Sequence, residues 1–350
     1  MKKSLIALAV LASAAGAASA QSSVTLFGIV DATVQLGRGN IADRTQLGNS
    51  GYNSSRLGFR GVEDLGGGMS ASFWLEAGVS NDNGTGGATN TNNQAAGATG
   101  GATGLVFNRR STVSLAGGWG ELRLGRDYTP QFWNLTVFDP FGTNGVGTTQ
   151  TLNSIITGVT QVRASNTIGY FLPGNLGGFY GQVQYYMGEN LQNNAATEDD
   201  GTGLGLRLGF ANGPFNVALA MSRTEYAAGD VRQNNIGGQW DFGIAKAMAH
   251  ISRDENGTVD GKGWLIGGLF PVGAGEIRAA YSRYETDAVG QPETKKIALG
   301  YVHNLSKRTA VYTTWARVKN SGGAAQALNG ATTGANSNSS GLDLGIRHSF

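Results

Sequence analysis

The sequence predicts an all-β fold, a 16-stranded antiparallel transmembrane β-barrel, and three observations support this prediction. Residues 1–20 have the layout of an export signal. Segments of about ten residues with alternating side chains follow, and their connections are alternately short and long. Hydrocarbon offers no hydrogen-bonding partner to the backbone, so a sheet that crosses a membrane must close on itself.

The N-terminus predicts a cleavable secretory signal peptide over 1–20. Lys2 and Lys3 precede an apolar run over 5–11, and small residues lead up to Ala20. No later stretch approaches the eighteen or so consecutive apolar residues of a transmembrane helix. We therefore expect residues 21–350 to form a single domain, the barrel.

The composition is that of a wall with one wet face and one lipid face. Charged residues make up 14% of the chain, against roughly 25% in soluble domains. Removing Lys2 and Lys3 from the 26 basic residues leaves 24 against 24 acidic ones, so the mature chain is formally neutral. The absence of cysteine excludes a disulfide scaffold and thiol zinc sites. We expect no nucleic-acid partner.

Period-two alternation defines the strands, since a tilted strand needs roughly 9 to 11 residues to cross. Leu204, Leu206 and Leu208 alternate with Gly205 and Arg207, and the last segment ends in an aromatic residue, Phe350. Sixteen such segments are predicted, at 24–36, 52–64, 69–80, 104–116, 119–127, 162–173, 177–189, 202–211, 214–225, 230–242, 244–254, 260–270, 275–286, 293–303, 309–319 and 340–350.

The connections between these segments agree with a barrel whose two termini lie at the short-turn, periplasmic end. The predicted tight turns are 65–68, 117–118, 173–177, 212–213, 243, 271–274 and 304–308. The longer connections are 37–51, 81–103, 128–161, 190–201, 226–229, 255–259, 287–292 and 320–339. Barrels of sixteen strands leave an aqueous lumen, so passive conduction is the expected function.

Several motifs, in order along the whole chain, resemble those of the general porins of betaproteobacteria. They are SVTLFG (23–28), SRLGFRGVEDLGGG (55–68), FNRR (107–110), LGRDYTP (124–130), RASNTIGY (163–170), LSKRT (305–309) and GIRHSF (345–350). The resemblance implies a homotrimeric porin of the outer membrane. It also implies that the loop 128–161 folds inward as a constriction loop, with Phe132, Trp133, Phe138 and Phe141 available to pack against the inner wall.

The resemblance further implies anion preference, set by wall arginines at the constriction. Carried over by motif, these are Arg56, Arg109 and Arg163. Glu76 would be the opposing acid, and Asp139 is the one carboxylate within the constriction loop.

Further lumen charges are expected at Arg60, Arg110 and Arg126. Arg56 and Arg60 are four residues apart and so share a face of their strand. Adjacent residues point to opposite faces, so at most one of Arg109 and Arg110 can face the lumen of a regular strand.

The charges over 104–173 favour anions slightly. The basic residues there are Arg109, Arg110, Arg123, Arg126 and Arg163, and the acidic ones are Glu121, Asp127 and Asp139.

The expected partners are those of an outer-membrane porin that passes small ions and hydrophilic solutes. They are outer-membrane lipid, lipopolysaccharide, periplasmic chaperones and the barrel-assembly machinery, for which Phe350 would be the C-terminal assembly signal.

We expect no enzyme, cofactor or metal site. The three histidines, His250, His303 and His348, are far apart and lack metal-ligand spacing. Residues 257–263 resemble a phosphate loop only superficially, because Lys262 is not followed by Ser or Thr. The alternatives left open are a substrate-specific outer-membrane channel and an adhesive surface barrel, with a barrel hydrolase as a weaker third. Competition of the ion current by solutes would separate a specific channel from general diffusion.

Overall fold

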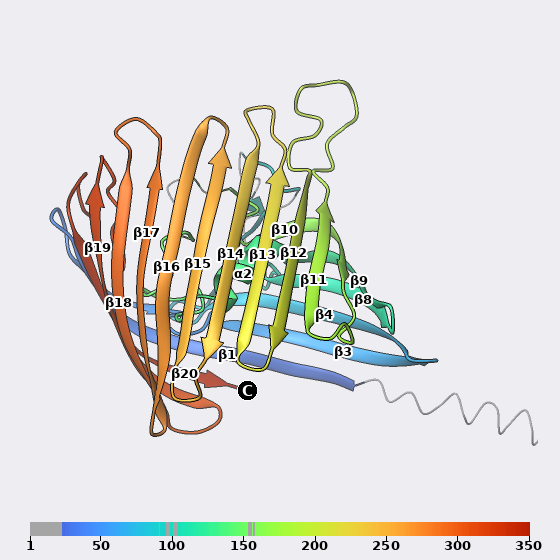
Figure 1. Ribbon diagram of the computed structural model, residues 1–350, viewed down its shortest axis with the longest axis horizontal. Helices are drawn as coiled ribbons and strands as arrows, with labels where there is room; N and C mark the ends of the chain where they lie inside the picture. Colours follow the sequence, from blue (N-terminus) through green and yellow to red (C-terminus); the bar gives the residue numbers. More distant parts are fainter. Residues whose placement is uncertain (1–22, 91, 96–98, 101–103, 153–155, 157) are drawn as a thin grey trace, which may run out of the picture.

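The computed structural model describes residues 23–350 except 91, 96–98, 101–103, 153–155 and 157, so the predicted signal peptide lies outside the described residues. Within the described part, sixteen long strands form an antiparallel barrel (Figure 1). They are β1 (Ser23–Arg38), β3 (Arg56–Gly66), β4 (Met69–Ser80), β8 (Arg110–Gly117), β9 (Gly120–Tyr128), β10 (Arg163–Phe171), β11 (Phe179–Tyr186), β12 (Gly203–Asn212), β13 (Phe215–Thr224), β14 (Val231–Asp241), β15 (Lys246–Asn256), β16 (Val259–Val272), β17 (Gly275–Thr286), β18 (Glu293–Asn304), β19 (Thr309–Ser321) and β20 (Ser339–Ser349).

The first and last strands close the barrel. β1 pairs with β20 from Ile29↔Ser349 to Arg38↔Ser340, and its other edge pairs with β3. At the chain end, Gly28 and Phe350 exchange backbone hydrogen bonds, each 3.1 Å from N to O. Closure gives the backbone groups of the two terminal strands partners inside the sheet.

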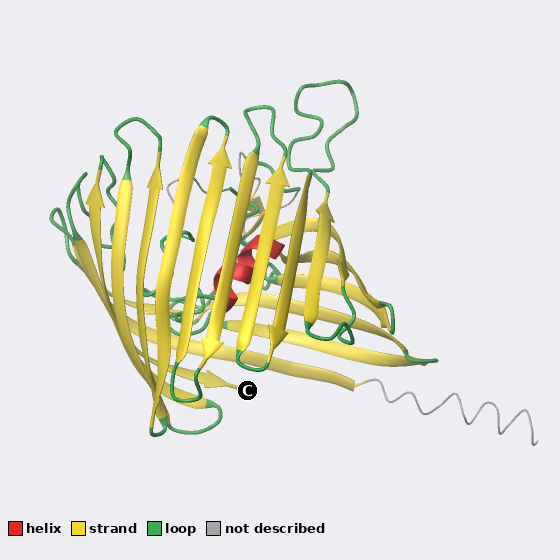
Figure 2. Cartoon of the chain, viewed as in Figure 1, coloured by secondary structure: helices red, strands yellow, loops and turns green. Residues whose placement is uncertain are grey.

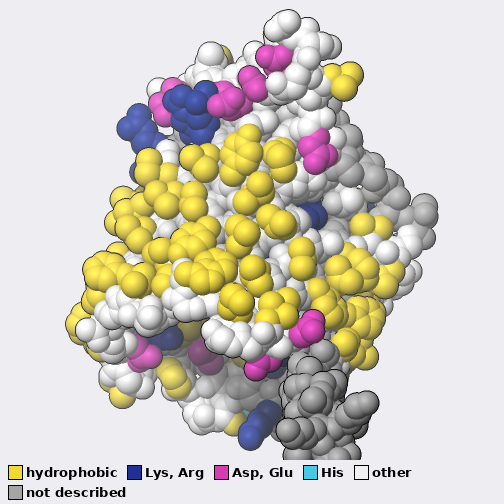
Figure 3. Space-filling model, turned by 90° about the vertical axis from the view of Figure 1, so that its right-hand side faces the viewer, with side chains coloured by type: hydrophobic (Ala, Val, Ile, Leu, Met, Phe, Trp, Pro, Cys, Tyr) yellow, Lys and Arg dark blue, Asp and Glu magenta, His cyan; other side chains and the backbone are white. Residues whose placement is uncertain are grey.

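The two faces of the wall differ in chemistry as the alternation predicts. On β12, Leu204, Leu206 and Leu208 point outward and are 53%, 43% and 43% exposed. Arg207, between them in sequence, points inward and lies over the Tyr180 ring. Figure 3 shows hydrophobic side chains forming a broad band across one outer face, with charged side chains above and below it.

The predicted strands agree closely with the observed ones, with one clear shift. β8 begins at Arg110 rather than near 104. The Asn108 side chain accepts a hydrogen bond from Gly78 N at 2.8 Å and donates one to Ala88 O at 3.0 Å, so the segment before β8 is held by β4 and by the loop after it. The long connections also contain four short strands, β2 (Arg44–Asn49), β5 (Thr85–Gly86), β6 (Thr89–Asn90) and β7 (Thr99–Gly100).

The predicted tight turns join the strands where expected. The turn between β3 and β4 contains Gly66, Gly67 and Gly68, with φ angles of 78°, 61° and 77°. Side chains with a Cβ rarely adopt such angles, which explains three consecutive glycines there.

One helix, α2 (Pro130–Val137), lies inside the barrel against the inner faces of β12, β13 and β14 (Figure 2). It belongs to the long connection between β9 and β10. Among the described residues, no helix has the length and apolar character needed to cross a membrane.

The face assignment makes a testable prediction at Leu219, which points outward in the middle of β13. We expect Leu219→Arg to destabilise the barrel by about 2–4 kcal/mol, because it places a charge against hydrocarbon. Ser70→Arg, on the inner face of β4, should change stability little. Urea titration of the folded fraction in phospholipid vesicles measures both, and equal effects would contradict the assigned faces.

Candidate functional site: a constriction lined by arginine

The loop between β9 and β10 turns into the barrel and is anchored first through α2. Pro130 lies in the first turn of α2, where a backbone N–H would have no partner within the helix, so proline loses no hydrogen bond there. The Asn134 amide donates to Ala218 O at 2.8 Å, and the Asn235 amide donates to Gln131 O at 3.1 Å. These bonds fix the helix to β13 and β14.

Small residues on the inner wall make room for the rest of the loop. A Cβ on Gly237 would lie 2.3 Å from Phe138 Cδ2, so this ring occupies the space that a side chain would fill. Further on, the loop residues Phe141 and Val146 form a buried cluster with inward residues of β16 to β19 and with Leu328. The wall members of that cluster are Leu265, Ala280, Ala298, Ala316 and Val318.

Asp139 organises this loop from inside. It is 3% exposed, and its carboxylate accepts hydrogen bonds from the backbone N–H groups of Phe141, Thr143 and Thr149 at 2.9, 3.2 and 2.9 Å. Burial raises the pKa of the Asp139 carboxyl group, while these hydrogen bonds oppose the rise. The structure therefore places Asp139 within the loop, and it does not line the cavity described next.

A cavity of about 340 Å³ lies between the loop and the wall, where β3, β9, β10 and the residue before β8 line it. The wall contributes Arg56, Arg109, Tyr128 and Arg163, which lie together at this level of the barrel. The other lining residues are Asn53, Ser54, Phe132, Trp133, Thr136, Gly142, Thr143, Asn144, Leu152 and Val162.

One phenol and one carboxylate hold the three guanidinium groups. Arg109 Nε lies 2.6 Å from Glu76 Oε1, and Arg56 NH1 lies 3.4 Å from the same oxygen. The Tyr128 hydroxyl accepts hydrogen bonds from Arg109 at 2.6 Å and from Arg163 at 3.0 Å. The Arg163 guanidinium also lies 4.5 Å from the centre of the Tyr128 ring.

Glu76 thus lies on the same wall as the arginines, whereas the sequence analysis placed it opposite them. The register explains this, since Glu76 pairs with Gly58 of β3 and with Arg110 of β8. Cross-strand partners share one face of the sheet. Glu76 therefore balances one of three positive charges from beside them.

Arg109 and Arg110 both reach the inner side of the barrel, contrary to the expectation that only one could. Alternation applies within a strand, and β8 begins at Arg110. Arg109 lies just before β8, and its backbone N–H donates a hydrogen bond to the backbone carbonyl oxygen of Glu76 at 3.0 Å. Arg110 pairs with the inward Glu76, and its guanidinium lies 4.7 Å from the Trp74 ring centre.

Of the other two expected lumen charges, the structure places one inside. Arg60 lies over the inward rings of Phe27 and Trp74. Arg126 pairs with Ser111, on the side of the sheet that Leu124 and Val113 share. Its guanidinium donates to Asn108 O, Asn90 O and Ser165 Oγ. The prediction of a lumen position for Arg126 was therefore wrong, because Arg126 is two residues from the outward Leu124 and shares its face of the strand.

All four aromatic residues of the loop pack against the inner wall, as expected. Phe132 and Trp133 pack on Tyr128 of β9, with ring centres 5.0 and 5.3 Å apart, and they also line the cavity. Phe138 and Phe141 pack elsewhere on the wall. Tyr128 was not predicted as a site residue, although its motif had been recognised and it separates the loop aromatics from the arginines.

Comparison with known proteins assigns this architecture to a family. The family model described as Gram-negative porin matches residues 7–323. Outer membrane porin protein 32 of Delftia acidovorans is 39% identical and an outer membrane porin protein of Bordetella pertussis 29% identical, each over the full length of both chains. The solved structure of the anion-selective porin from Comamonas acidovorans is 35% identical, with a TM-score of 0.83 over 94% of this chain and 100% of its own.

The loop anchor makes a prediction at Phe141. We expect Phe141→Ala to weaken the docking of the loop by about 3–5 kcal/mol, the usual effect of removing a buried ring. Single-channel recordings should then show a larger and noisier conductance. Phe210→Ala removes an outward ring that does not contact the loop, and it should leave the conductance unchanged. A Phe141→Ala channel as quiet and narrow as the wild type would contradict this anchoring.

Proposed function

The chain belongs to the Gram-negative porin family, and from this premise we propose that its water-filled channel prefers anions because of Arg56, Arg109 and Arg163. As an outer-membrane porin it is a diffusion channel and not an enzyme. The Comamonas acidovorans relative is described as anion-selective. The proposal extends that property to this chain and assigns it to three named side chains.

The observation that carries the proposal is the lack of opposing charge across the cavity. Three arginines line one side, and the loop side presents Trp133, Thr136, Thr143 and Asn144. None of the described residues lining the cavity is acidic, and Glu76 beside the arginines offsets only one positive charge. A passing ion therefore meets net positive charge.

The size of the effect suits a diffusion channel. An anion about 7 Å from one unit charge gains about 0.6 kcal/mol in bulk water, and about 2.4 kcal/mol at an effective dielectric constant near 20. Energies in this range bias the flux without trapping the ion. Arginine also keeps its charge at any pH near neutrality, so this preference should not titrate there.

The homotrimer is part of the same proposal. On the outer wall, a depression of about 220 Å³ lies between the outward side chains of Val24, Phe73 and Val113, where the Phe73 ring covers Gly61. A second copy of the chain is the proposed occupant of this apolar groove. Outer-membrane lipid, lipopolysaccharide, periplasmic chaperones and the barrel-assembly machinery complete the proposed partners, with Phe350 as the assembly signal.

The charge assignment predicts the sign and size of the selectivity. Under a KCl gradient across a planar bilayer, the zero-current potential should have the sign of an anion-preferring pore. The Arg56→Ala, Arg163→Ala double variant should lose about threefold in chloride preference per charge removed. Glu76→Gln removes the one balancing acid and should raise the preference.

Arg317→Ala provides the matched control, because Arg317 points outward from β19. It should leave the zero-current potential where it was. Cation preference in the wild-type pore would contradict the assignment. An equal change of the zero-current potential in Arg317→Ala and in the double variant would contradict it too.

The groove predicts where subunits meet. Val113→Arg places a charge in the depression, so the variant should lose the trimer in native electrophoresis or mass photometry while the barrel stays folded. Val183→Arg, on the outer face of β11, serves as the control. Trimers that persist in Val113→Arg would place the interface elsewhere.

A further inference from the structure

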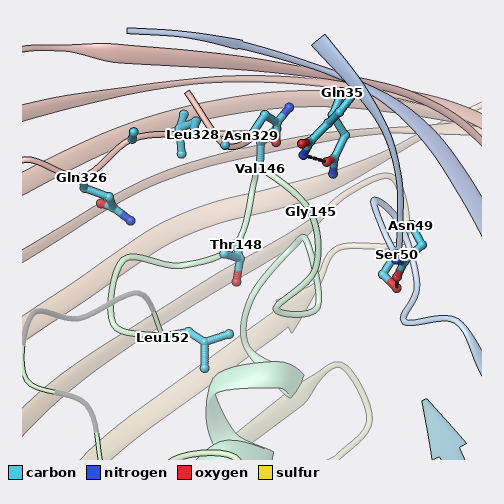
Figure 4. A pocket seen from close by; sticks show the side chains of 13 residues that line it. Gln35, Asn49, Ser50, Gly145, Val146, Thr148, Leu152, Gln326, Leu328 and Asn329 are labelled. Carbon is cyan, nitrogen blue, oxygen red and sulfur yellow. Dashed lines mark hydrogen bonds between the residues drawn. The ribbon is translucent and has the colours of Figure 1, made fainter. Parts of the chain in front are cut away.

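The protein has hollows both inside the barrel and on its outer wall. Figure 4 shows one of the inner hollows, between Gln35 of β1 and Val146 of the constriction loop, and it belongs to the lumen. A groove of about 530 Å³ lies instead on the outside of the barrel, across β11, β12, β13 and β14. It lies at the end of these strands that carries the long loops. We call it the outer groove.

The lower part of the outer groove is apolar. Leu204 of β12 pairs with Tyr185 of β11, and Leu206 pairs with Met221 of β13. Cross-strand partners share one face of the sheet, and all four of these side chains are exposed on the outer face. In a membrane they face the hydrocarbon, and Tyr185 lies near its boundary, as aromatic residues commonly do. This part of the groove suits acyl chains.

Two arginines form the upper end of the outer groove. Arg223 of β13 and Arg232 of β14 are direct cross-strand partners, and both side chains line the groove and are half exposed. Like charges in this arrangement repel each other. An anion that contacts both guanidinium groups would relieve the repulsion.

Three carboxylates contact this arginine pair and orient it. Asp230 lies 2.7 Å from Arg223 Nε and 3.6 Å from Arg232 NH2, while Glu255 lies 3.0 Å from Arg232 NH1 and Glu225 lies 3.3 Å from Arg223 NH1. Exposed ion pairs contribute little free energy, so a phosphate can replace some of these contacts. Among the described residues, Glu225 is the one acid that lines the outer groove, so the groove itself presents two positive charges against one negative charge.

The arginine pair lies at the boundary between the apolar wall and the loops. Met221 and Leu219, which precede Arg223 on the same face of β13, are both apolar and exposed. Figure 3 shows charged side chains gathered directly above the hydrophobic band. The long loops of such a barrel are extracellular, so this boundary is that of the outer leaflet. A lipid there has its headgroup beside the arginines and its chains beside the leucines.

Paired outward cations recur at the loop ends of the following strands. Arg253 of β15 pairs with Lys262 of β16, and Lys295 of β18 pairs with Lys319 of β19. These residues lie on the outer face, as Arg223 and Arg232 do. The repetition indicates that this side of the barrel faces a layer of anionic headgroups.

We propose that the outer groove binds lipid A, the phosphorylated and acylated part of lipopolysaccharide. One phosphate lies against Arg223 and Arg232, and one acyl chain lies along Leu204, Leu206 and Met221. This inference rests on lipopolysaccharide as a proposed partner and assigns it a site. The groove proposed for a second copy of the chain lies on β1, β3, β4 and β8, so both can be occupied at once.

The test measures the binding of lipid A to the folded protein in detergent by native mass spectrometry. EDTA is present, so that no divalent cation bridges the lipid and a carboxylate. The wild type should bind lipid A, and the Arg223→Gln, Arg232→Gln double variant should need a concentration about tenfold higher for each charge-assisted hydrogen bond lost. The phosphorylated disaccharide of lipid A without its acyl chains should bind the wild type far more weakly, because it does not contact the apolar part of the groove.

The matched control is the Lys307→Gln, Arg308→Gln double variant. It removes two exposed cations from the turn between β18 and β19, at the other end of the barrel, and should bind lipid A like the wild type. An equal loss of binding in both double variants would indicate general charge attraction and overturn the inference.

The remaining outcomes separate this site from the other proposals. Unchanged binding in the Arg223→Gln, Arg232→Gln variant overturns the site and leaves lipopolysaccharide a partner at another place. A wild type that does not bind lipid A overturns both the site and this partner, while the anion preference of the channel is unaffected. Loss of the trimer in the same variant would assign the outer groove to a second copy of the chain, which also overturns the inference.

Discussion

Every backbone N–H and C=O group within the membrane must have a hydrogen-bonding partner, and the rest of the structure depends on this constraint. The sheet satisfies it by closing into a barrel, and the pairing of β1 with β20 closes it. Gly28 and Phe350 exchange the last two backbone hydrogen bonds of this pairing. The closed sheet here has sixteen long strands, and the interior of a barrel of that size is too wide for wall side chains to fill. The wide lumen is thus a consequence of the number of strands.

The loop between β9 and β10 fills part of that lumen asymmetrically. Small inward residues such as Gly237 and Ala298 let Phe138 and Phe141 lie against the wall. Asp139 holds the turn together through three backbone N–H groups. The remaining opening therefore lies against the opposite wall, where the arginines are. Packing on one side of the lumen decides which charges a solute meets on the other.

The alternation of side chains along the sequence predicted most of the strands and their two faces. Alternation located the strands and their outward leucines, since the period of a strand is a property of the backbone alone. Arg126 could have been placed correctly, because it is two residues from the apolar Leu124 and therefore shares its outer face. Glu76 could not, since its position beside Arg109 depends on the register of β4 against β8. Nor could the burial of Asp139 or the role of Tyr128, which arise only when a distant loop folds into the barrel.

The central claim is that net positive charge on one wall, unopposed across the cavity, attracts anions there. Anomalous diffraction from crystals soaked in bromide and, separately, in rubidium would test it most directly. The account predicts bromide peaks beside Arg56, Arg109 and Arg163 and no rubidium within the same cavity. Rubidium in the cavity, or bromide bound only elsewhere in the lumen, would contradict it.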